Sequence, residues 1–231
     1  MSSDSSAVVS ASGIEAPGGI GLWGALFVSY VANPLVLPPV VYGTALAHVG
    51  APPLDVGKGV GIAVVFLVLM PLAYVGWMRA QGHVASLEIR DRTKRTGPFL
   101  VVLGAGVAAF AAVLGTELVG QRLLAALVGY HVVNTGLLGL ITMRWKISVH
   151  CASVAGAVAT LAFLSVHVPG RVLRPEAVGH VEWMGGIGLV VLVLWARIRS
   201  RAHTPSQAVA GTVLGLAPYL ELLAVARTLG L

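Results

Sequence analysis

The sequence predicts an all-α fold, a polytopic transmembrane helical bundle with six or seven spans. Of the 231 residues, 57% are hydrophobic and only 10% are charged, and the mean hydropathy is +0.88. Soluble domains carry roughly 25% charged residues, so a single water-facing globule cannot bury this much apolar surface. The apolar runs are continuous rather than short and alternating, which favours spanning helices over a membrane β-barrel.

Seven uncharged or nearly uncharged stretches have the length of a membrane span, and they set the expected order of elements. They cover residues 18–47, 59–78, 98–116, 123–143, 151–170, 177–196 and 204–226. The first contains Asn33-Pro34, and we expect it to be kinked or broken there. The last contains Pro218 and Glu221 and could be tilted or partly interfacial, which leaves the choice between six and seven spans.

The first 17 residues differ in composition from the rest. They are rich in Ser, Ala and Gly and carry no Lys or Arg, whereas a signal peptide has a basic start. We therefore expect a disordered tail over 1–17 and one integral-membrane domain over 18–231. The single Cys151 excludes an internal disulfide and a cysteine-based zinc site, and its apolar surroundings predict a small buried side chain.

The net charge of +6 is concentrated in particular loops. If all seven stretches cross the membrane, the loops at 79–97, 144–150 and 197–203 share one face. Ten of the 15 basic residues fall there: Arg79, Arg90, Arg92, Lys94, Arg95, Arg144, Lys146, Arg197, Arg199 and Arg201. The positive-inside rule places this face in the cytoplasm of a multi-pass protein of the cell membrane, although arginines kept for chemistry would produce the same bias. Cationic loops of membrane proteins meet lipid headgroups or phosphorylated substrates, so we expect membrane lipids and no nucleic acid as partners.

The charge-dense loop that ends at Pro98 has two interpretations. Its long basic side chains could anchor the adjoining helices by snorkelling to the interface. Alternatively, Arg90, Arg92 and Arg95 could clamp a phosphate, because guanidinium groups offer planar bidentate donors to oxyanions.

The segment 144–150 precedes the fifth stretch. Lys146, Ser148 and His150 alternate, so in an extended turn their side chains would point the same way. The start of the following helix lies close by, and its free N–H groups and positive dipole end make an anion site.

The segment 196–207 opens the seventh stretch. Thr204, Pro205 and Gln207 form the sequence pattern of a capping box, with proline at the first helical position. His203 precedes them, next to the arginines at 197, 199 and 201. Neighbouring cations disfavour an imidazolium, which keeps the ring neutral as a nucleophile requires.

Together these three segments resemble the signatures of the type-2 phosphatidic acid phosphatase (lipid phosphate phosphatase) superfamily, over roughly residues 88–215. The spacing Arg197–x5–His203–x3–Gln207 resembles the third signature, which has Ser-Arg–x5–His–x3–Asp. Ser148-Val-His150 resembles the second, Pro-Ser-Gly-His, and the loop ending in Pro98 resembles the first, Lys–x6–Arg-Pro.

The departures from these signatures are specific. Aligned on Pro98, the loop has Arg90 at the Lys position and Gly97 at the Arg position, so that Arg92 or Arg95 would have to replace the missing arginine. Gln207 stands in place of the aspartate. The chain is similar in this to a divergent branch of the superfamily. Three further positions differ: Ala196 replaces Ser, Ile147 replaces Pro and Val149 replaces Gly.

The resemblance implies a metal-independent phosphatase with no cofactor. His203 would attack phosphorus to form a phosphohistidine, His150 would protonate the leaving group, and Gln207 would orient His203 through its carbonyl oxygen. Phosphoryl oxygens would be bound by a further set of residues: Arg197, Arg90, Arg92, Arg95, Lys146 and Ser148. The substrate would be an amphiphilic isoprenoid or glycerolipid, as a phosphate or a diphosphate.

Two other readings bear on the function. A magnesium-dependent prenyltransferase needs paired Asp-rich motifs. The chain has only Asp4, Asp55 and Asp91, which are far apart, so this function is excluded. The alternative that stays open is a non-catalytic lipid-binding protein or a transporter on the same scaffold. Two features would support this alternative. One is the broken first span, and the other is the presence of three polar residues inside predicted spans, His131, Asn134 and Glu221. The oligomeric state is left open.

Overall fold

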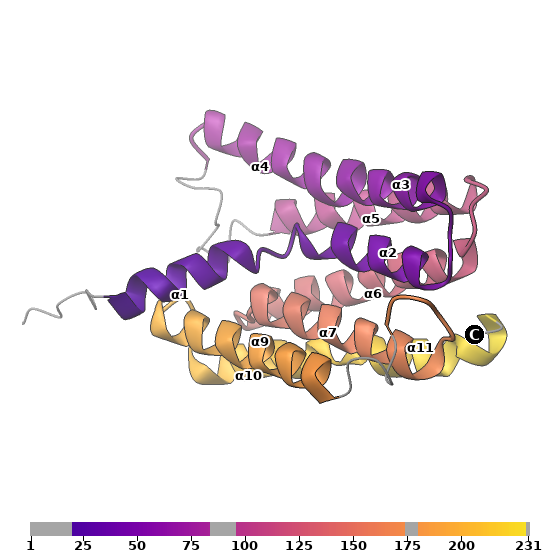
Figure 1. Cartoon of the computed structure of the whole chain (residues 1–231). Coiled ribbons are helices and arrows are strands. Elements are labelled where there is room, and N and C mark those ends of the chain that lie inside the picture. Colours follow the sequence, from indigo (N-terminus) through magenta and orange to yellow (C-terminus); the bar gives the residue numbers. More distant parts are fainter. Residues whose placement is uncertain (1–19, 84–95, 174–179, 230–231) are drawn as a thin grey trace, which may run out of the picture.

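The computed structural model describes residues 20–83, 96–173 and 180–229, and this part of the chain is a bundle of helices with short connections and no strand (Figure 1). The predicted all-α membrane bundle is thereby confirmed. Two predictions lie outside the described residues: the tail at 1–17, and the phosphate-binding arginines Arg90, Arg92 and Arg95.

The first passage through the bundle consists of two helices, α1 (Ile20–Val31) and α2 (Leu37–His48). They are separated at Asn33-Pro34, where the Leu35 N–H donates to Asn33 Oδ1 at 3.0 Å. The predicted break is confirmed. Its cause is that Pro34 has no N–H to donate and the asparagine side chain offers the backbone a turn instead of a helix.

The second passage is continuous over Pro53–Ala80. It consists of α3 (Pro53–Ile62), the π-helical segment η1 (Ala63–Leu69) and α4 (Met70–Ala80). Pro71 lies at the start of α4 and cannot donate a helical hydrogen bond. The wider turn just before it, in which the Met70 N–H bonds to the Val65 carbonyl, accommodates the ring without ending the helix.

The remaining helices run back and forth along the same axis (Figure 1). They are α5 (Thr96–Leu114), α6 (Gln121–Arg144), α7 (Val149–His167), α9 (His180–Arg199), α10 (Pro205–Gly215) and α11 (Ala217–Leu229). Five stretches are long and apolar enough to cross a membrane: Pro53–Ala80, Thr96–Leu114, Gln121–Arg144, Val149–His167 and Pro205–Ala226. The 20-residue α9 and the α1–α2 pair run alongside them, so the chain is a multi-pass membrane protein.

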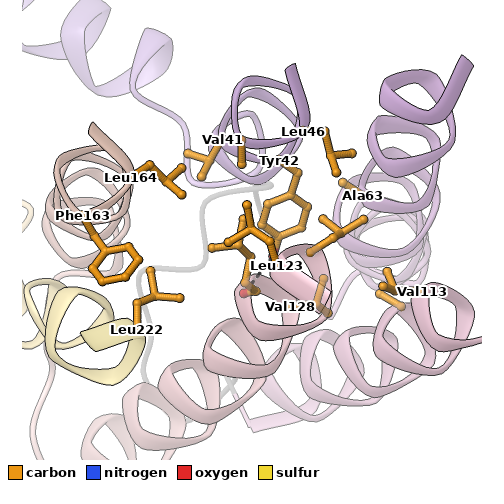
Figure 2. Close-up of a cluster of buried hydrophobic side chains, with 14 of the residues drawn as sticks. Val41, Tyr42, Leu46, Ala63, Val113, Leu123, Val128, Phe163, Leu164 and Leu222 are labelled. Carbon is orange, nitrogen blue, oxygen red and sulfur yellow. Dashed lines mark hydrogen bonds between the residues drawn. The ribbon is translucent and has the colours of Figure 1, made fainter. Parts of the chain in front are cut away.

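The core lies where α2 and α6 meet the helices on either side (Figure 2). Tyr42 of α2 is 2% exposed and donates its hydroxyl to the Leu127 carbonyl of α6 at 3.4 Å. Phe163 of α7 and Leu222 of α11 close the same cluster. This packing fixes the broken first passage against the centre of the bundle.

The outer surface is apolar as well. Trp23, Phe27, Leu100, Leu140 and Met184 are between 60% and 74% exposed. Large side chains of this kind scattered over a whole belt need a lipid solvent, because a soluble monomer rarely exposes wide apolar patches.

The predicted sharing of one face by three loops agrees with the helix order. The end of α6, the start of α7, the end of α9 and the start of α10 lie at one end of the bundle, together with the end of α4 and the start of α5 (Figure 1). We call this the basic end, and the end formed by the α2–α3, α5–α6 and α7–α9 connections the opposite end. The assignment of the basic end to the cytoplasm stays a prediction.

Candidate functional site

The starts of α7 and α10 are joined at the basic end by their backbones. The Ser148 N–H donates to the Gln207 carbonyl at 3.2 Å. Gly211 permits this approach, because a Cβ at that position would lie 2.5 Å from the Ser148 carbonyl oxygen. Gly215, one turn on, faces the Ala152 carbonyl in the same way. The second and third signature-like segments therefore form one unit.

The spacing Gly211–x3–Gly215 is a sequence signal for this contact. Small residues four apart allow two membrane helices to pack with their backbones close together. The sequence analysis did not use this pattern, which would have predicted that α10 lies directly against another helix.

Ser148 begins α7 as its N-cap. Its Oγ accepts from the Cys151 N–H at 3.4 Å, and the residue is fully buried. The structure thus gives Ser148 a capping role, and its contact with a phosphate stays a prediction. Cys151 is 1% exposed, which confirms the expected buried side chain.

The predicted capping box of α10 is confirmed. Thr204 Oγ1 accepts from the Gln207 N–H at 3.4 Å, and Gln207 Oε1 accepts from the Thr204 N–H at 3.2 Å, with Pro205 in the first turn. The oxygen that would orient His203 is therefore engaged by the helix start. An amide oxygen has two lone pairs, so the orienting role, which stays a prediction, requires the second one.

His203 and Arg197 are both buried, with 7% and 5% exposure. The His203 N–H donates to the Arg197 carbonyl at the end of α9, at 3.2 Å. Between them Arg201 adopts a left-handed conformation with φ of 53°, which folds the chain back sharply. The burial of an arginine in the last turn of a helix, together with a histidine in the loop that follows, is unusual, because such groups are mostly exposed in proteins.

Lys146 connects the two loops of the site. Its Nζ donates to the Ala202 carbonyl at 2.8 Å, in the residue before His203. This contact positions the Lys146 ammonium beside the turn that carries His203.

His150 is the second residue of α7 and is partly buried. The first-turn N–H groups of a helix lack intrahelical partners, and the positive end of the helix dipole favours an anion there. Because Ser148 and Gln207 are bonded, His150 and His203 are carried on adjoining helix starts.

The first signature-like segment is described only from Thr96 onward. Gly97, which stands at its arginine position, packs against Tyr74 of α4, and a Cβ there would lie 2.6 Å from the tyrosine hydroxyl. A side chain at 97 would have to displace Tyr74. The departure from the signature thus has a packing reason, and any arginine of this loop that serves the site comes from residues outside the described part.

An apolar groove of about 240 Å³ lies between α5 and α6. It begins at Thr96 and Met143, at the basic end, and runs inward along Phe99 and Gly139. The Phe99 ring packs against Gly139, where an added Cβ would lie 3.5 Å from the ring. Sequence reasoning missed the groove, although the row of small residues on α6 marks it: Thr135, Gly136, Gly139 and Thr142.

A second cavity, of about 90 Å³, lies deeper in the bundle and is lined partly by His131 and Asn134. Asn134 Nδ2 donates to Glu221 Oε2 of α11 at 2.8 Å, so two of the three polar residues inside the predicted spans are bonded to each other. The same bond gives Glu221 a partner inside the bundle.

Within the described ranges, no three His, Cys, Asp or Glu side chains gather in a way that could hold a metal ion. Comparison of the chain with protein-family models, with curated proteins and with solved structures finds no match.

Proposed function

We propose that this chain is an integral-membrane lipid-phosphate phosphatase. It hydrolyses a phosphate or diphosphate monoester of an isoprenoid or glycerolipid through a phosphohistidine intermediate. The observation that carries the proposal is the burial of Arg197, in the last turn of α9, and of His203, in the turn that leads to the joined starts of α7 and α10. A buried guanidinium and a buried imidazole near two helix N-termini suit a phosphate dianion.

In the proposed reaction, a nitrogen of neutral His203 attacks the terminal phosphorus, and the bond from that phosphorus to the leaving-group oxygen breaks. The leaving group, a lipid alkoxide from a monophosphate or a lipid phosphate from a diphosphate, takes the proton of the His150 imidazolium. A water molecule then gives its proton to His150 and its oxygen to phosphorus, which releases inorganic phosphate and restores His203. Arg197 and Lys146 stabilise the charge on the phosphoryl oxygens, which is the main contribution that a protein makes to phosphoryl transfer.

The groove between α5 and α6 supports an amphiphilic substrate. Because it starts at the basic end and is lined mainly by apolar residues, a hydrocarbon chain lying in it keeps its phosphate at the level of α7 and α10. A substrate without a chain lacks this binding energy, so short-chain phosphates are poorer substrates than long-chain ones.

The test is phosphate release by the purified full chain in detergent. Polyprenyl phosphate, polyprenyl diphosphate and phosphatidate are supplied without added metal, with and without a chelator. His203→Ala and His150→Ala are each expected to lower the rate by about 10³-fold or more. His83→Ala, which removes an exposed histidine at the same end of the bundle, serves as the matched control and keeps full activity. Release that survives both catalytic substitutions, or that stops with the chelator, contradicts the proposal.

A second candidate is a non-catalytic lipid-binding protein or transporter on the same scaffold. The observation that favours it is the cavity of about 90 Å³ next to the break in the first passage, which His131 and Asn134 help to line, because interrupted membrane helices often line binding sites. Folded protein that retains lipid phosphates but releases no phosphate from any of them would support this function over hydrolysis.

A further inference from the structure

The groove between α5 and α6 is short and has a definite inner end. On α5 its lining extends from Thr96 to Leu103, which is about 10 Å along the helix axis at a rise of 1.5 Å per residue. Just beyond Leu103 the two helices are in contact. Gly106 is buried there, and a Cβ at this position would lie 2.9 Å from the Val132 side chain. This contact closes the groove on its inner side.

The sides of the groove face the lipid. Leu100 on α5 and Leu140 and Met143 on α6 all line the groove, and each of these side chains is more than half exposed. A hydrocarbon chain can therefore enter sideways from the lipid, without a separate opening. Lipid tails are as apolar as leucine side chains, so the chain gains packing contacts in the groove rather than escape from water.

The outer end of the groove adjoins the candidate site. Phe99, which forms part of one wall, also packs against the buried cluster of Leu138, Ile147 and Ala152. Ile147 directly precedes Ser148, the N-cap of α7, and Ala152 lies in the following turn of that helix. One layer of side chains thus connects the groove to the start of α7.

We propose that the groove contacts only the first part of the substrate chain, roughly eight carbons from the phosphate, because an extended chain of that size, with bonds of about 1.5 Å, has the length of the groove. This assignment rests on the proposed function, since a phosphate held at the starts of α7 and α10 fixes the position of the chain. Longer chains leave the groove at Leu103 and continue in the lipid. The protein therefore accepts acyl and isoprenoid chains of any length from about eight carbons upward.

The experiment measures kcat/KM for n-alkyl phosphates of about two to about sixteen carbons in one mixed-micelle composition. Each value is divided by that of the unaltered protein, so that partition of the substrate into the micelle cancels. Leu140→Ala, near the outer end, is expected to lower kcat/KM by about three- to tenfold for chains of about four carbons and longer. Leu103→Ala, at the inner end, is expected to cause a similar loss only from about eight carbons upward.

Val107→Ala is the matched control. Val107 lies one turn further inward than Leu103 on α5, is more than half exposed and does not line the groove, so this variant keeps full kcat/KM at every chain length. A loss in Val107→Ala that appears only with the longest chains overturns the proposal, because the chain then continues along α5. Equal kcat/KM in the unaltered protein and all three variants also overturns it, because the groove then holds bulk lipid only.

Binding of the same alkyl phosphates separates this assignment from the proposed hydrolysis. The rise in the thermal midpoint of the full chain measures binding without any reaction, and it is expected to show the same dependence on chain length in the three variants. If this dependence is present but no phosphate is released, the groove is assigned correctly and the hydrolysis is wrong. If phosphate is released but the loss in Leu103→Ala is the same at every chain length, the hydrolysis stands and the groove assignment is overturned.

Discussion

The two ends of the bundle each bury a histidine, His48 at the end of α2 and His203 in the loop before α10, and the two differ in what holds the adjacent loop. At the opposite end, His48 is fully buried at the end of α2, and its ring holds the α7–α9 connection. Nδ1 accepts from the Leu173 N–H at 3.0 Å, so Nε2 carries the proton and donates to the Val168 carbonyl at 2.9 Å. At the basic end, the turn that carries His203 is closed by backbone bonds, Ser148 to Gln207 and His203 to Arg197.

The difference separates a structural histidine from a candidate catalytic one. Where the ring makes the bonds that close a loop, its removal costs stability. Where the main chain makes those bonds, the residue at that position can be changed without opening the turn. Burial alone, 0% for His48 and 7% for His203, does not distinguish the two cases.

The largest expected effect is the loss of activity in His203→Ala. We expect phosphate release to fall by about 10³-fold or more, because no other group in the scheme can form the covalent intermediate. The thermal midpoint should fall less than in His48→Ala, since the backbone bonds from Ser148 to Gln207 and from His203 to Arg197 remain. The rate and the thermal midpoint are measured on the same preparation. If His203→Ala unfolds the protein, the proposed difference between the two ends is wrong.

His48→Ala is the counterpart at the opposite end. It leaves the Leu173 N–H and the Val168 carbonyl without their ring partners and opens a cavity in the loop. We expect a loss of about 2–4 kcal/mol in the free energy of unfolding, followed by denaturant unfolding in mild detergent. The rate per folded molecule should stay unchanged, and a midpoint equal to that of the unaltered protein would contradict the structural role.

Gly211→Ala tests how tightly the basic end must be joined. The added methyl group would meet the Ser148 carbonyl at 2.5 Å, so α10 has to move away from α7. A displacement of this kind separates the groups on the two helix starts. A misplacement of about 1 Å is expected to lower the rate of phosphate release by about 10²-fold. Gly104→Ala, at a position with open space around it, is the matched control and should keep full activity. Equal rates for both variants would show that the close approach is not needed.

Local patterns predicted much of the fold. Hydropathy alone predicted the helical bundle, Asn33-Pro34 predicted the break in the first passage, and Thr204 with Gln207 predicted the capping box. Each of these depends on residues within a few positions of one another, so the sequence contains the whole cause. The order of the loops then follows from the number of crossings.

The candidate site could be predicted only in part, because its features join distant segments. The bond from Ser148 to Gln207 spans 59 positions of the chain, and the contact of Gly97 with Tyr74 depends on how α4 and α5 pack. The burial of Arg197 and the groove between α5 and α6 arise in the same way. Spacing can name the residues of a site, but only tertiary packing determines which of them are enclosed.

The smallest expected effect concerns Gln207, whose amide caps α10 and which the resemblance assigns to His203. Gln207→Ala removes one half of the capping box and should cost about 1 kcal/mol in the free energy of unfolding. Thr204→Val removes the other half and provides the matched control for stability. If Gln207 also orients His203, Gln207→Ala lowers the rate further than Thr204→Val does at equal stability.

Gln207→Glu keeps the cap and supplies the carboxylate of the family pattern, so we expect it to retain the thermal midpoint and to raise the rate. Identical rates for the three variants would assign Gln207 to the cap alone, and the basic end would then resemble the opposite end in using this side chain only to hold its loop.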